Sequence, residues 1–570
     1  MVRLARRSRG DDTHGGFVVC TSDEFVLLHQ MNDFDLDGYT ALLLSDISEI
    51  RSGEHERAWE RMIGYEGTLK QVGLKYDVDL SNMGLLLKSL HNTGKNVIVE
   101  CESKDPDEDE FYIGMIVKVG RSRLWFVHFD ANGKWEDHGV RIPLSKITRV
   151  QFDTRYINVF SRYLPVLRPK RMADLLPLPQ GFSAVGILCG IKTDPQKLDL
   201  ALFVSDRACA AAGVFTTNLV CGSPVKVSRE RLPRATARAV VVNSGNSNAA
   251  TGLKGIEDAQ AMTALVAQQI GASADDVLVC STGVIGRFLP MEKLQAGIPF
   301  AAKQLASSPE AFHNAARAMM TTDTFPKQAT ATVTLGGKTV RISGVCKGAA
   351  MIAPNMATML CVIMTDAALK PDDAAAMLKH AVGDSFNCIS VDGHESTSDS
   401  VILLANGAAG FGLTTDVDRA AFQQALDEVA MKLATDIIRD GEGASHFVEI
   451  NVTGCRTRDE AFRIAKTIAD SPLVKTAICG ADPNWGRIVS AAGYSGVPLK
   501  EEDMSLVVNG FPLYKDGAPV AFDPKVVSAN LRDNRNTTID LTLKHGSSSV
   551  RFWTCDLTKE YVELNADYTT

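Results

Sequence analysis

Four prolines crowd into a basic stretch near residue 170, and they divide this chain into parts that must fold separately. They are Pro165, Pro169, Pro177 and Pro179. Proline has a fixed φ and no N–H, so a run of this kind interrupts helices and strands and is typical of a linker. We therefore expect a first domain at 1–165, a linker at 166–180 and a larger second part. A length of 570 residues allows about three or four folding units, at roughly 100–200 residues each.

Charge and hydropathy narrow the classes of partner. The chain has 60 Lys and Arg against 68 Asp and Glu, a net charge of -8. Nucleic-acid binding needs a basic face, so we expect no nucleic acid as partner. No uninterrupted apolar run could span a bilayer, and the Arg-rich start, 1–9, leads into Asp11 and Asp12. We therefore expect no membrane partner and a cytoplasmic location. None of the twelve cysteines forms a CxxC pair, so we expect them to be reduced.

The first part contains an internal repeat. The segment LSDISEIR at 44–51 returns as LSKITRVQ at 144–151, and GFV at 16–18 corresponds to GMI at 114–116. Alternating apolar residues and β-branched content favour strands in both copies. We expect a β-rich domain of two small repeated barrel-like units, without a role that the residues identify. A repeat this short could also be coincidence.

The second part alternates strands and helices. Residues 238–243 predict a buried strand, whereas 258–270, 371–382 and 416–440 have helical periodicity. Mixed runs of this kind favour layered α/β packing. No dinucleotide fingerprint or Walker loop is present in the sequence.

One segment of the second part suits a nucleophile. A stretch rich in Gly, Ala, Pro and Asn, 347–357, leads to Thr358, and a strongly apolar strand follows. The hydroxyl of Thr358 could attack the carbonyl of Ala357 and convert the amide to an ester, which water then cleaves. The new α-amine, with a pKa of about 7.7–8.0, could then act as the base that activates the hydroxyl. The alternative is a buried strand that happens to begin with threonine.

From about residue 181 to 570 the sequence resembles the ornithine acetyltransferase family, the bifunctional glutamate N-acetyltransferases. The segments that carry the resemblance are GIKTDPQKLDLALFVSD, VVNSGNSNAATG, CSTGVIG, MTTDTFPK, KGAAMIAPNMATMLCVIMTD, SVDG, DGEGASHF, KTAICGADPNWGRI and NADYTT. The resemblance implies an N-terminal-nucleophile type of α/β fold. It also implies cleavage between Ala357 and Thr358 into an alpha part at 181–357 and a beta part at 358–570. Two copies of each part would then assemble as a heterotetramer.

The resemblance also implies roles for single residues. Thr358 would be the nucleophile, and Thr282 and Gly283 would form an oxyanion hole. The residues implied in substrate binding are Thr324, Lys347, Thr358, Glu442, Asn565 and Thr570. Without the resemblance, Thr282 and Gly283 would be read as a turn and Lys347 as a surface lysine. Glu442 would be read as an exposed loop acid, and Asn565 and Thr570 as part of the chain end.

The activity implied is transfer of an acetyl group from N-acetylornithine to glutamate in arginine biosynthesis, with acetyl-CoA as a possible further donor. We expect no metal or redox cofactor. His394 and Glu395 stand beside Asp392 where the family usually has Asp-Thr, but no second histidine has ligand spacing. Two alternatives stay open: an amidase or aminopeptidase with the same nucleophile, and a ligand-binding fusion protein whose second half is not catalytic.

Overall fold

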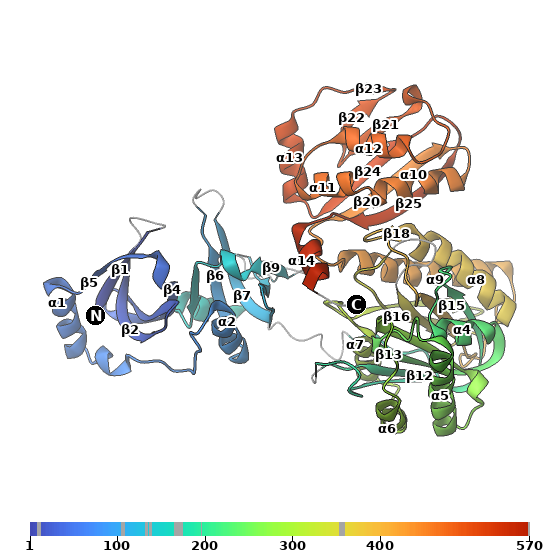
Figure 1. The fold of residues 1–570 in the computed structure, drawn as a ribbon, viewed down its shortest axis with the longest axis horizontal. Helices are drawn as coiled ribbons and strands as arrows, with labels where there is room; N and C mark the ends of the chain where they lie inside the picture. Colours follow the sequence, from blue (N-terminus) through green and yellow to red (C-terminus); the bar gives the residue numbers. More distant parts are fainter. Residues whose placement is uncertain are drawn as a thin grey trace. The chain divides into compact units, whose positions relative to one another are not determined.

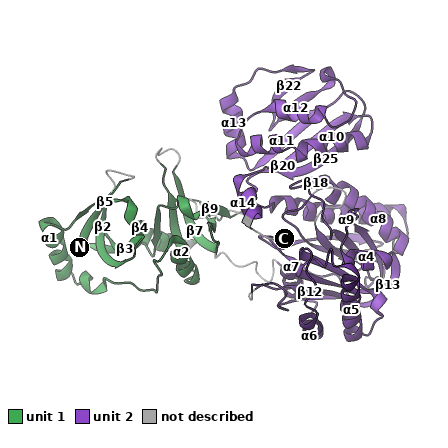
Figure 2. Cartoon of the chain, in the orientation of Figure 1, with its two compact units in different colours: residues 1–169 green, residues 170–570 purple. Residues whose placement is uncertain are grey.

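The computed structural model describes residues 1–7, 13–103, 109–130, 135, 139–164, 175–194, 197–352 and 359–567. They form two compact units, Met1–Pro169 and Lys170–Thr570, which Figure 2 shows in different colours. The division falls inside the proline-rich stretch, most of which lies outside the described residues. Within the described ranges, no helix is both long and apolar enough to cross a bilayer.

Unit 1 is built on one antiparallel sheet of ten strands, in the order β5-β1-β2-β3-β4-β10-β6-β7-β8-β9. The strands are β1 (Val2–Arg6), β2 (Thr13–Thr21), β3 (Phe25–Asn32), β4 (Asp35–Leu43), β5 (Ile47–Arg51), β6 (Asn96–Cys101), β7 (Glu110–Val119), β8 (Arg123–His128), β9 (Val140–Pro143) and β10 (Arg149–Phe152). The helices are α1 (Glu54–Tyr65), α2 (Met83–Asn92) and α3 (Arg155–Tyr163). Buried leucines of α2 pack in the same core as the sheet.

The two halves of unit 1 follow the same pairing order. In the first half β5 pairs with β1, and in the second half β10 pairs with β6. A short 3-10 turn precedes each of these strands, at Leu44–Asp46 and Leu144–Lys146. The expected two barrel-like units are not shown, because β4 pairs with β10 and the described strands form a single sheet that is not closed. Periodicity identifies strands but not the edges that meet, so it did not indicate this pairing.

Unit 2 contains two sheets and most of the helices labelled in Figure 1. The first sheet runs β14-β13-β12-β19-β17-β16-β15, and β11 pairs with β12. Its strands are β11 (Phe182–Ile187), β12 (Leu200–Phe215), β13 (Arg234–Asn246), β14 (Val277–Val284), β15 (Lys327–Leu335), β16 (Lys338–Lys347), β17 (Leu360–Thr365) and β19 (Ser400–Ala405). The helices up to residue 439 are α4 (Ser223–Glu230), α5 (Gly252–Ile270), α6 (Met291–Ala302), α7 (Pro309–Met319), α8 (Pro371–Asp384) and α9 (Asp416–Arg439).

Strand β12 changes partners along one of its edges, and this divides the first sheet into two half-sheets. On that edge residues 200–205 pair with β11 and 210–215 pair with β19, whereas the other edge pairs with β13 at 200–204, 209 and 211. Val240 of β13 and Val362 of β17 therefore lie in one buried cluster between the two half-sheets. Alternate residues of the same strands pack outward, against α5 and α6 on one side and α8 and α9 on the other. The predicted layered α/β packing is confirmed.

The predicted helices are present with small differences at their ends. Helix α8 begins at Pro371 as expected, and α9 begins after a capping box in which Thr415 accepts from the N–H of Asp418. Helix α9 ends at Arg439, one residue before the predicted end, and Asp440 caps it. The side chain of Asp440 contributes to the candidate active site described below.

The second sheet has the order β18-β25-β20-β24-β21-β22-β23. Its strands are β18 (Ile389–Ser390), β20 (Phe447–Cys455), β21 (Ser505–Val508), β22 (Phe511–Lys515), β23 (Ala518–Pro519), β24 (Asn536–Thr542) and β25 (Ser548–Cys555). The accompanying helices are α10 (Arg458–Asp470), α11 (Pro472–Cys479), α12 (Trp485–Gly493), α13 (Pro524–Asp533) and α14 (Lys559–Asp567). The pairing of His446 with Asp556, at 3.0 Å between Nδ1 and Oδ2, ties the start of β20 to the residue after β25.

Candidate active site

Ends of strands from different parts of the first sheet meet at one place. Lys347 is the last residue of β16 and pairs with Leu360, the first residue of β17. Leu360 pairs in turn with Ser400, the first residue of β19. Lys347 Nζ lies 3.3 Å from Thr282 Oγ1 on β14. The sequence-predicted residues Lys347 and Thr282 are thus neighbours, although 65 positions separate them.

Gly283 follows Thr282 at a point where only glycine fits. Its φ is +130°, which L side chains rarely adopt. A Cβ at this position would lie 2.3 Å from the carbonyl carbon of Gly245 and 2.5 Å from the backbone N of Asn246. Strands β13 and β14 run parallel here, with Gly245 opposite Gly283. The close approach of the two backbones keeps the peptide groups beside Thr282 in one arrangement.

Lys347 is a buried cation with a lowered pKa. Its side chain is almost inaccessible to water, and burial lowers the pKa because it disfavours the charged form. Lys327 acts in the same direction, whereas the carboxylates of Asp323, Glu442 and Asp399 oppose the shift. An anionic ligand would therefore stabilise the charged form of Lys347.

Glu442 and Asn565 meet across 123 positions of sequence. The Nδ2 of Asn565, on α14, donates to Oε2 of Glu442 at 3.1 Å. The backbone N–H of Glu442 donates to the carbonyl of Ala349 at 2.9 Å, so this loop is held beside the end of β16. Burial raises the pKa of the Glu442 carboxyl, and the contacts with Asn565 and Lys347 act against that rise. Glu442 therefore interacts electrostatically with Lys347, and Asn565 contacts Glu442.

Thr324 lies in a different hydrogen-bonding environment. Its backbone N–H donates to Asp440 Oδ2 at 2.9 Å, and its hydroxyl donates to Asp440 Oδ1. The described hydrogen bonds of the Thr324 side chain thus point to Asp440 and not to Lys347 or Glu442.

The sequence analysis missed a buried ion triad that lies next to these residues. Lys327 Nζ contacts Asp323 Oδ1 and Asp440 Oδ2, each at 2.6 Å, and all three side chains are essentially inaccessible to water. Burial opposes ionisation, yet the two carboxylates raise the pKa of Lys327, and Lys327 and Lys347 lower the pKa of Asp323. Asp323 also accepts from the N–H of Gly348 at 2.7 Å, so the triad positions the residue after Lys347.

The signal for this triad was present but weak. Asp323 and Lys327 are four residues apart within MTTDTFPK, and Asp440 opens DGEGASHF. Acid and base at such spacing are usually solvated surface charges, and only the packing of β15 against α9 makes them buried.

Two aspartates hold the chain on either side of residues 353–358, which lie outside the described residues together with Thr570. Before this segment, Asp392 accepts from the N–H of Met351 at 2.6 Å and of Ile352 at 2.9 Å. After it, Asp399 Oδ1 accepts from the N–H of Met359 at 2.9 Å. The predicted cleavage site, Ala357 and Thr358, falls between these two anchors.

Asp399 is also chemically unusual. It is fully buried, burial raises the pKa of its carboxyl well above the usual value, and no described residue forms a hydrogen bond with its Oδ2. The sequence analysis did not single out this residue, since SDS at 398–400 looks like a turn before a strand. His394, by contrast, is exposed, and its backbone N–H donates to Asp392 Oδ1 at 3.1 Å.

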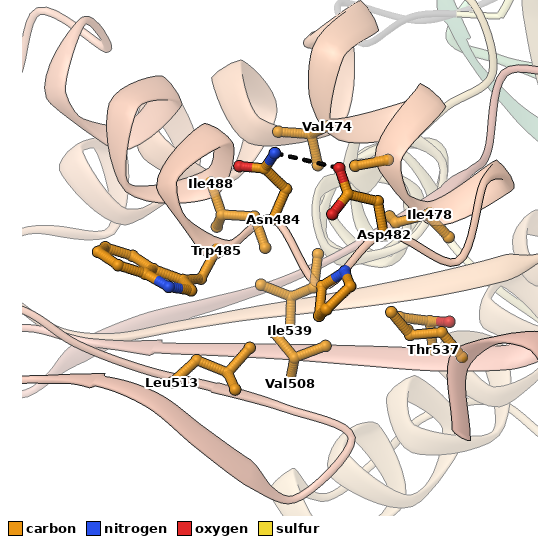
Figure 3. Close-up of a pocket in the computed structure, with 13 residues that line it drawn as sticks. Val474, Ile478, Asp482, Asn484, Trp485, Ile488, Val508, Leu513, Thr537 and Ile539 are labelled. Carbon is orange, nitrogen blue, oxygen red and sulfur yellow. Dashed lines mark hydrogen bonds between the residues drawn. The ribbon is translucent and has the colours of Figure 1, made fainter. Parts of the chain in front are cut away.

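Figure 3 shows an apolar cavity elsewhere in unit 2, and none of the predicted site residues lines it. Residues of α11, α12 and the second sheet surround it, including Ile478, Trp485 and Ile539. Asn484 Nδ2 donates to Asp482 Oδ2 at 3.1 Å at its rim. The candidate active site is therefore the polar cluster around Lys347.

A buried cluster of ionisable groups with shifted pKa values, on a layered α/β scaffold, is typical of an enzyme active site. Comparison with known proteins agrees. The ArgJ family model matches residues 183–570. The "Arginine biosynthesis bifunctional protein ArgJ" of Rhodopirellula baltica is 46% identical over 401 residues, covering 69% of this chain and 96% of that protein. That of Geobacter sulfurreducens is 45% identical over 393 residues, covering 69% and 99%.

Solved structures include a relative from Mycobacterium tuberculosis, an ornithine acetyltransferase complexed with ornithine. It is 35% identical and covers 32% of this chain and 94% of its own, with a TM-score of 0.28. The chain belongs to the ArgJ family. It is accordingly an acyltransferase of arginine biosynthesis. The family match leaves out unit 1, since it begins at residue 183.

Proposed function

We propose that this enzyme transfers an acetyl group from N-acetylornithine to glutamate through an acetyl ester on Thr358. The observation that carries the proposal is the convergence of Thr282, Lys347, Glu442 and Asn565, which come from four separate segments. Family membership supports the activity, because the relatives are named as bifunctional proteins of arginine biosynthesis.

The first step of the proposal is self-cleavage. The Thr358 hydroxyl attacks the carbonyl carbon of Ala357, the C–N bond breaks, and the α-amine of Thr358 takes the proton. Water then hydrolyses the ester, which leaves a carboxylate on Ala357 and a free hydroxyl on Thr358. The anchors at Asp392 and Asp399 support this step, because they hold the backbone on both sides of the scissile segment. Constraint of this kind favours the attack by orienting the two groups.

The two fragments would remain together after cleavage. Strand β16 precedes the proposed site and β17 follows it, and the two are antiparallel neighbours from Ile342 opposite Thr365 to Lys347 opposite Leu360. The proposed enzyme therefore consists of an alpha and a beta fragment that share one sheet. We propose further that two of each fragment assemble.

Acetyl transfer then takes place in two half-reactions. The free α-amine of Thr358 accepts the hydroxyl proton as Oγ attacks the acetyl carbonyl, and ornithine leaves with that proton on its amine. The glutamate amine next attacks the acetyl ester, which releases N-acetylglutamate and restores the hydroxyl. One covalent intermediate shared by both halves predicts ping-pong kinetics.

The surrounding residues have distinct roles in this proposal. The Thr282 hydroxyl and the Gly283 N–H donate to the oxyanion of each tetrahedral intermediate, and one such donor contributes about 2.7–4 kcal/mol. The Lys347 ammonium pairs with a substrate carboxylate, and the Glu442 carboxylate pairs with a substrate amine. Asn565 and Thr570 close the site, and Thr324 binds substrate through the segment that Asp440 holds. The proposed mechanism requires no metal or redox cofactor, and an assay with acetyl-CoA in place of N-acetylornithine decides whether it is a further donor.

A denaturing gel with N-terminal sequencing tests the cleavage, and an acetyl-transfer assay tests the activity. We expect two fragments, the second beginning at Thr358, and acetyl transfer that needs glutamate as acceptor. Uncleaved protein with full activity would contradict the mechanism. Release of acetate from N-acetylornithine at a rate that glutamate does not change would favour the amidase alternative.

The KM for N-acetylornithine is expected to rise with pH across the alkaline range. Only the ammonium form of Lys347 attracts a carboxylate, and because burial lowers its pKa, that charge disappears at a lower pH than for an exposed lysine. Lys347→Met should raise KM by roughly 10- to 100-fold below this transition, since a hydrogen bond to a charged group contributes about 1.5–3 kcal/mol. Initial rates measured against pH check both statements, and a wild-type KM that stays flat contradicts them.

A further inference from the structure

One strand pair joins the sheets of the two halves of unit 1. Strands β4 and β10 are antiparallel, with Leu42 opposite Arg149, Ala41 opposite Val150 and Thr40 opposite Gln151. Val150, at the centre of this junction, has 1% of its surface exposed. The junction thus joins the fourth strand of one repeat to the fifth strand of the other.

The same two strand edges recur, without a strand partner, at the ends of the ten-stranded sheet. The repeat makes β5 the counterpart of β10, and β9 the counterpart of β4. Among the described residues, no strand pairs with the outer edge of β5 or of β9. Ile50 occupies the place that Val150 has in the other repeat, and 64% of its surface is exposed. A β-branched residue that is buried where the neighbouring strand is present is therefore exposed where no described strand lies beside it.

We propose that β5 of one copy of this chain pairs with β9 of a second copy, in the register that β10 and β4 use inside the chain. The internal junction shows that these two kinds of edge fit each other, and an edge of unpaired N–H and C=O groups is a template for such pairing. The internal register places Ile50 opposite Arg141, Glu49 opposite Ile142 and Arg51 opposite Val140. Pro143 lies just beyond this register, as Leu43 does at the internal junction, so its missing N–H interrupts no pair.

The contact is heterologous, since one copy offers β5 and the other offers β9. Repetition of such a contact gives a closed ring when the rotation between neighbours closes, and a filament when it does not. The partner of each edge is a second copy of this chain, because every copy carries the complementary edge. This inference does not depend on the acetyl-transfer chemistry of unit 2.

The charged residues beside Ile50 could instead indicate that the edge of β5 is protected from pairing with another strand. Glu49 and Arg51 are exposed, with 4.0 Å between Oε1 and Nε, and charges on an edge strand can protect it from pairing. Arg149, however, stands where Glu49 does, and it forms an ion pair with Glu100 of β6 while its strand pairs with β4. A charge at this position is therefore compatible with strand pairing.

Cross-linking between introduced thiols in the full-length protein tests the contact and its register. A protein with Ile50→Cys is mixed with one carrying Arg141→Cys, both in a Cys20→Ser background because Cys20 is exposed. After mild oxidation, a non-reducing gel should show a covalent pair of chains. Glu49→Cys with Arg141→Cys is the matched control, because neighbouring residues of a strand point to opposite faces and the thiols cannot meet.

We expect at least roughly tenfold more product from the in-register pair than from the control, since disulfide geometry tolerates little displacement. Arg51→Cys with Val140→Cys is a second in-register pair, in case substitution at Arg141 disturbs β9. Near-ultraviolet circular dichroism confirms that each variant is folded. No product from either in-register pair, or equal product from the control, would overturn the proposal.

Discussion

Thr358→Ala is expected to abolish both self-cleavage and acetyl transfer. Without the hydroxyl, the carbonyl of Ala357 has no attacking group and the acetyl group has no acceptor on the enzyme. The protein should run as one chain on a denaturing gel, and kcat should fall by at least about 10³-fold, since loss of a covalent nucleophile can cost about 10⁶-fold. The gel and a steady-state assay with N-acetylornithine and glutamate measure these effects.

Thr358→Ser is the matched control, because it keeps the hydroxyl and removes only a methyl group. Cleaved fragments and measurable transfer are expected for this variant. If Thr358→Ala retained full transfer, the covalent mechanism would be excluded even if the family assignment stood. If it retained cleavage but lost transfer, another residue would have to start the cleavage.

Lys327→Met is expected to lower the free energy of unfolding by about 3–5 kcal/mol, because it leaves two buried carboxylates without their cation. Asp323 and Asp440 each lie 2.6 Å from the ammonium, and neither has access to water. Acetyl transfer should fall as well, since Asp323 holds Gly348 and Asp440 holds Thr324. Urea unfolding, followed by circular dichroism, measures the change in stability.

Lys544→Met provides the control for a lost ion pair at the surface. Lys544 Nζ lies 2.7 Å from Asp516 Oδ1, but both side chains are about half exposed. Exposed pairs contribute little, so this variant should unfold at nearly the same urea concentration as the wild type. Equal destabilisation by the two substitutions would show that the burial of the triad is not what makes Lys327 important.

Local patterns predicted much of the fold. Pro371 begins α8 because its fixed φ suits the first turn of a helix, and the periodicity of 416–440 corresponds to α9. These signals act between residues that are close in sequence, so they can be read without the tertiary structure. The open sheet of unit 1 could not be read in this way, because the pairing of β4 with β10 joins residues about a hundred positions apart.

The candidate site divides in the same manner. The motifs that carry the family resemblance identified Thr282, Gly283, Lys347, Glu442 and Asn565 as residues of interest. Their mutual contacts depend on distant segments, as do the partners that no motif indicated, namely Asp323, Lys327, Asp392, Asp399 and Asp440. Burial changes the meaning of such residues, because a carboxylate at the surface and one at the core have different pKa values and different energetic value.

The sequence by itself determined the layered α/β character of the second part, the family and the position of Thr358 ahead of an apolar run, and it predicted a linker at 166–180. Only the tertiary structure decided that Lys347 faces Thr282, that Lys327 sits between two buried carboxylates, and that β5 and β9 end an open sheet. The physical reason is the separation along the sequence over which each kind of interaction acts. Backbone propensity and periodicity act over a few residues, whereas desolvation, ion pairing and strand edges are properties of residues that meet only when the chain is folded.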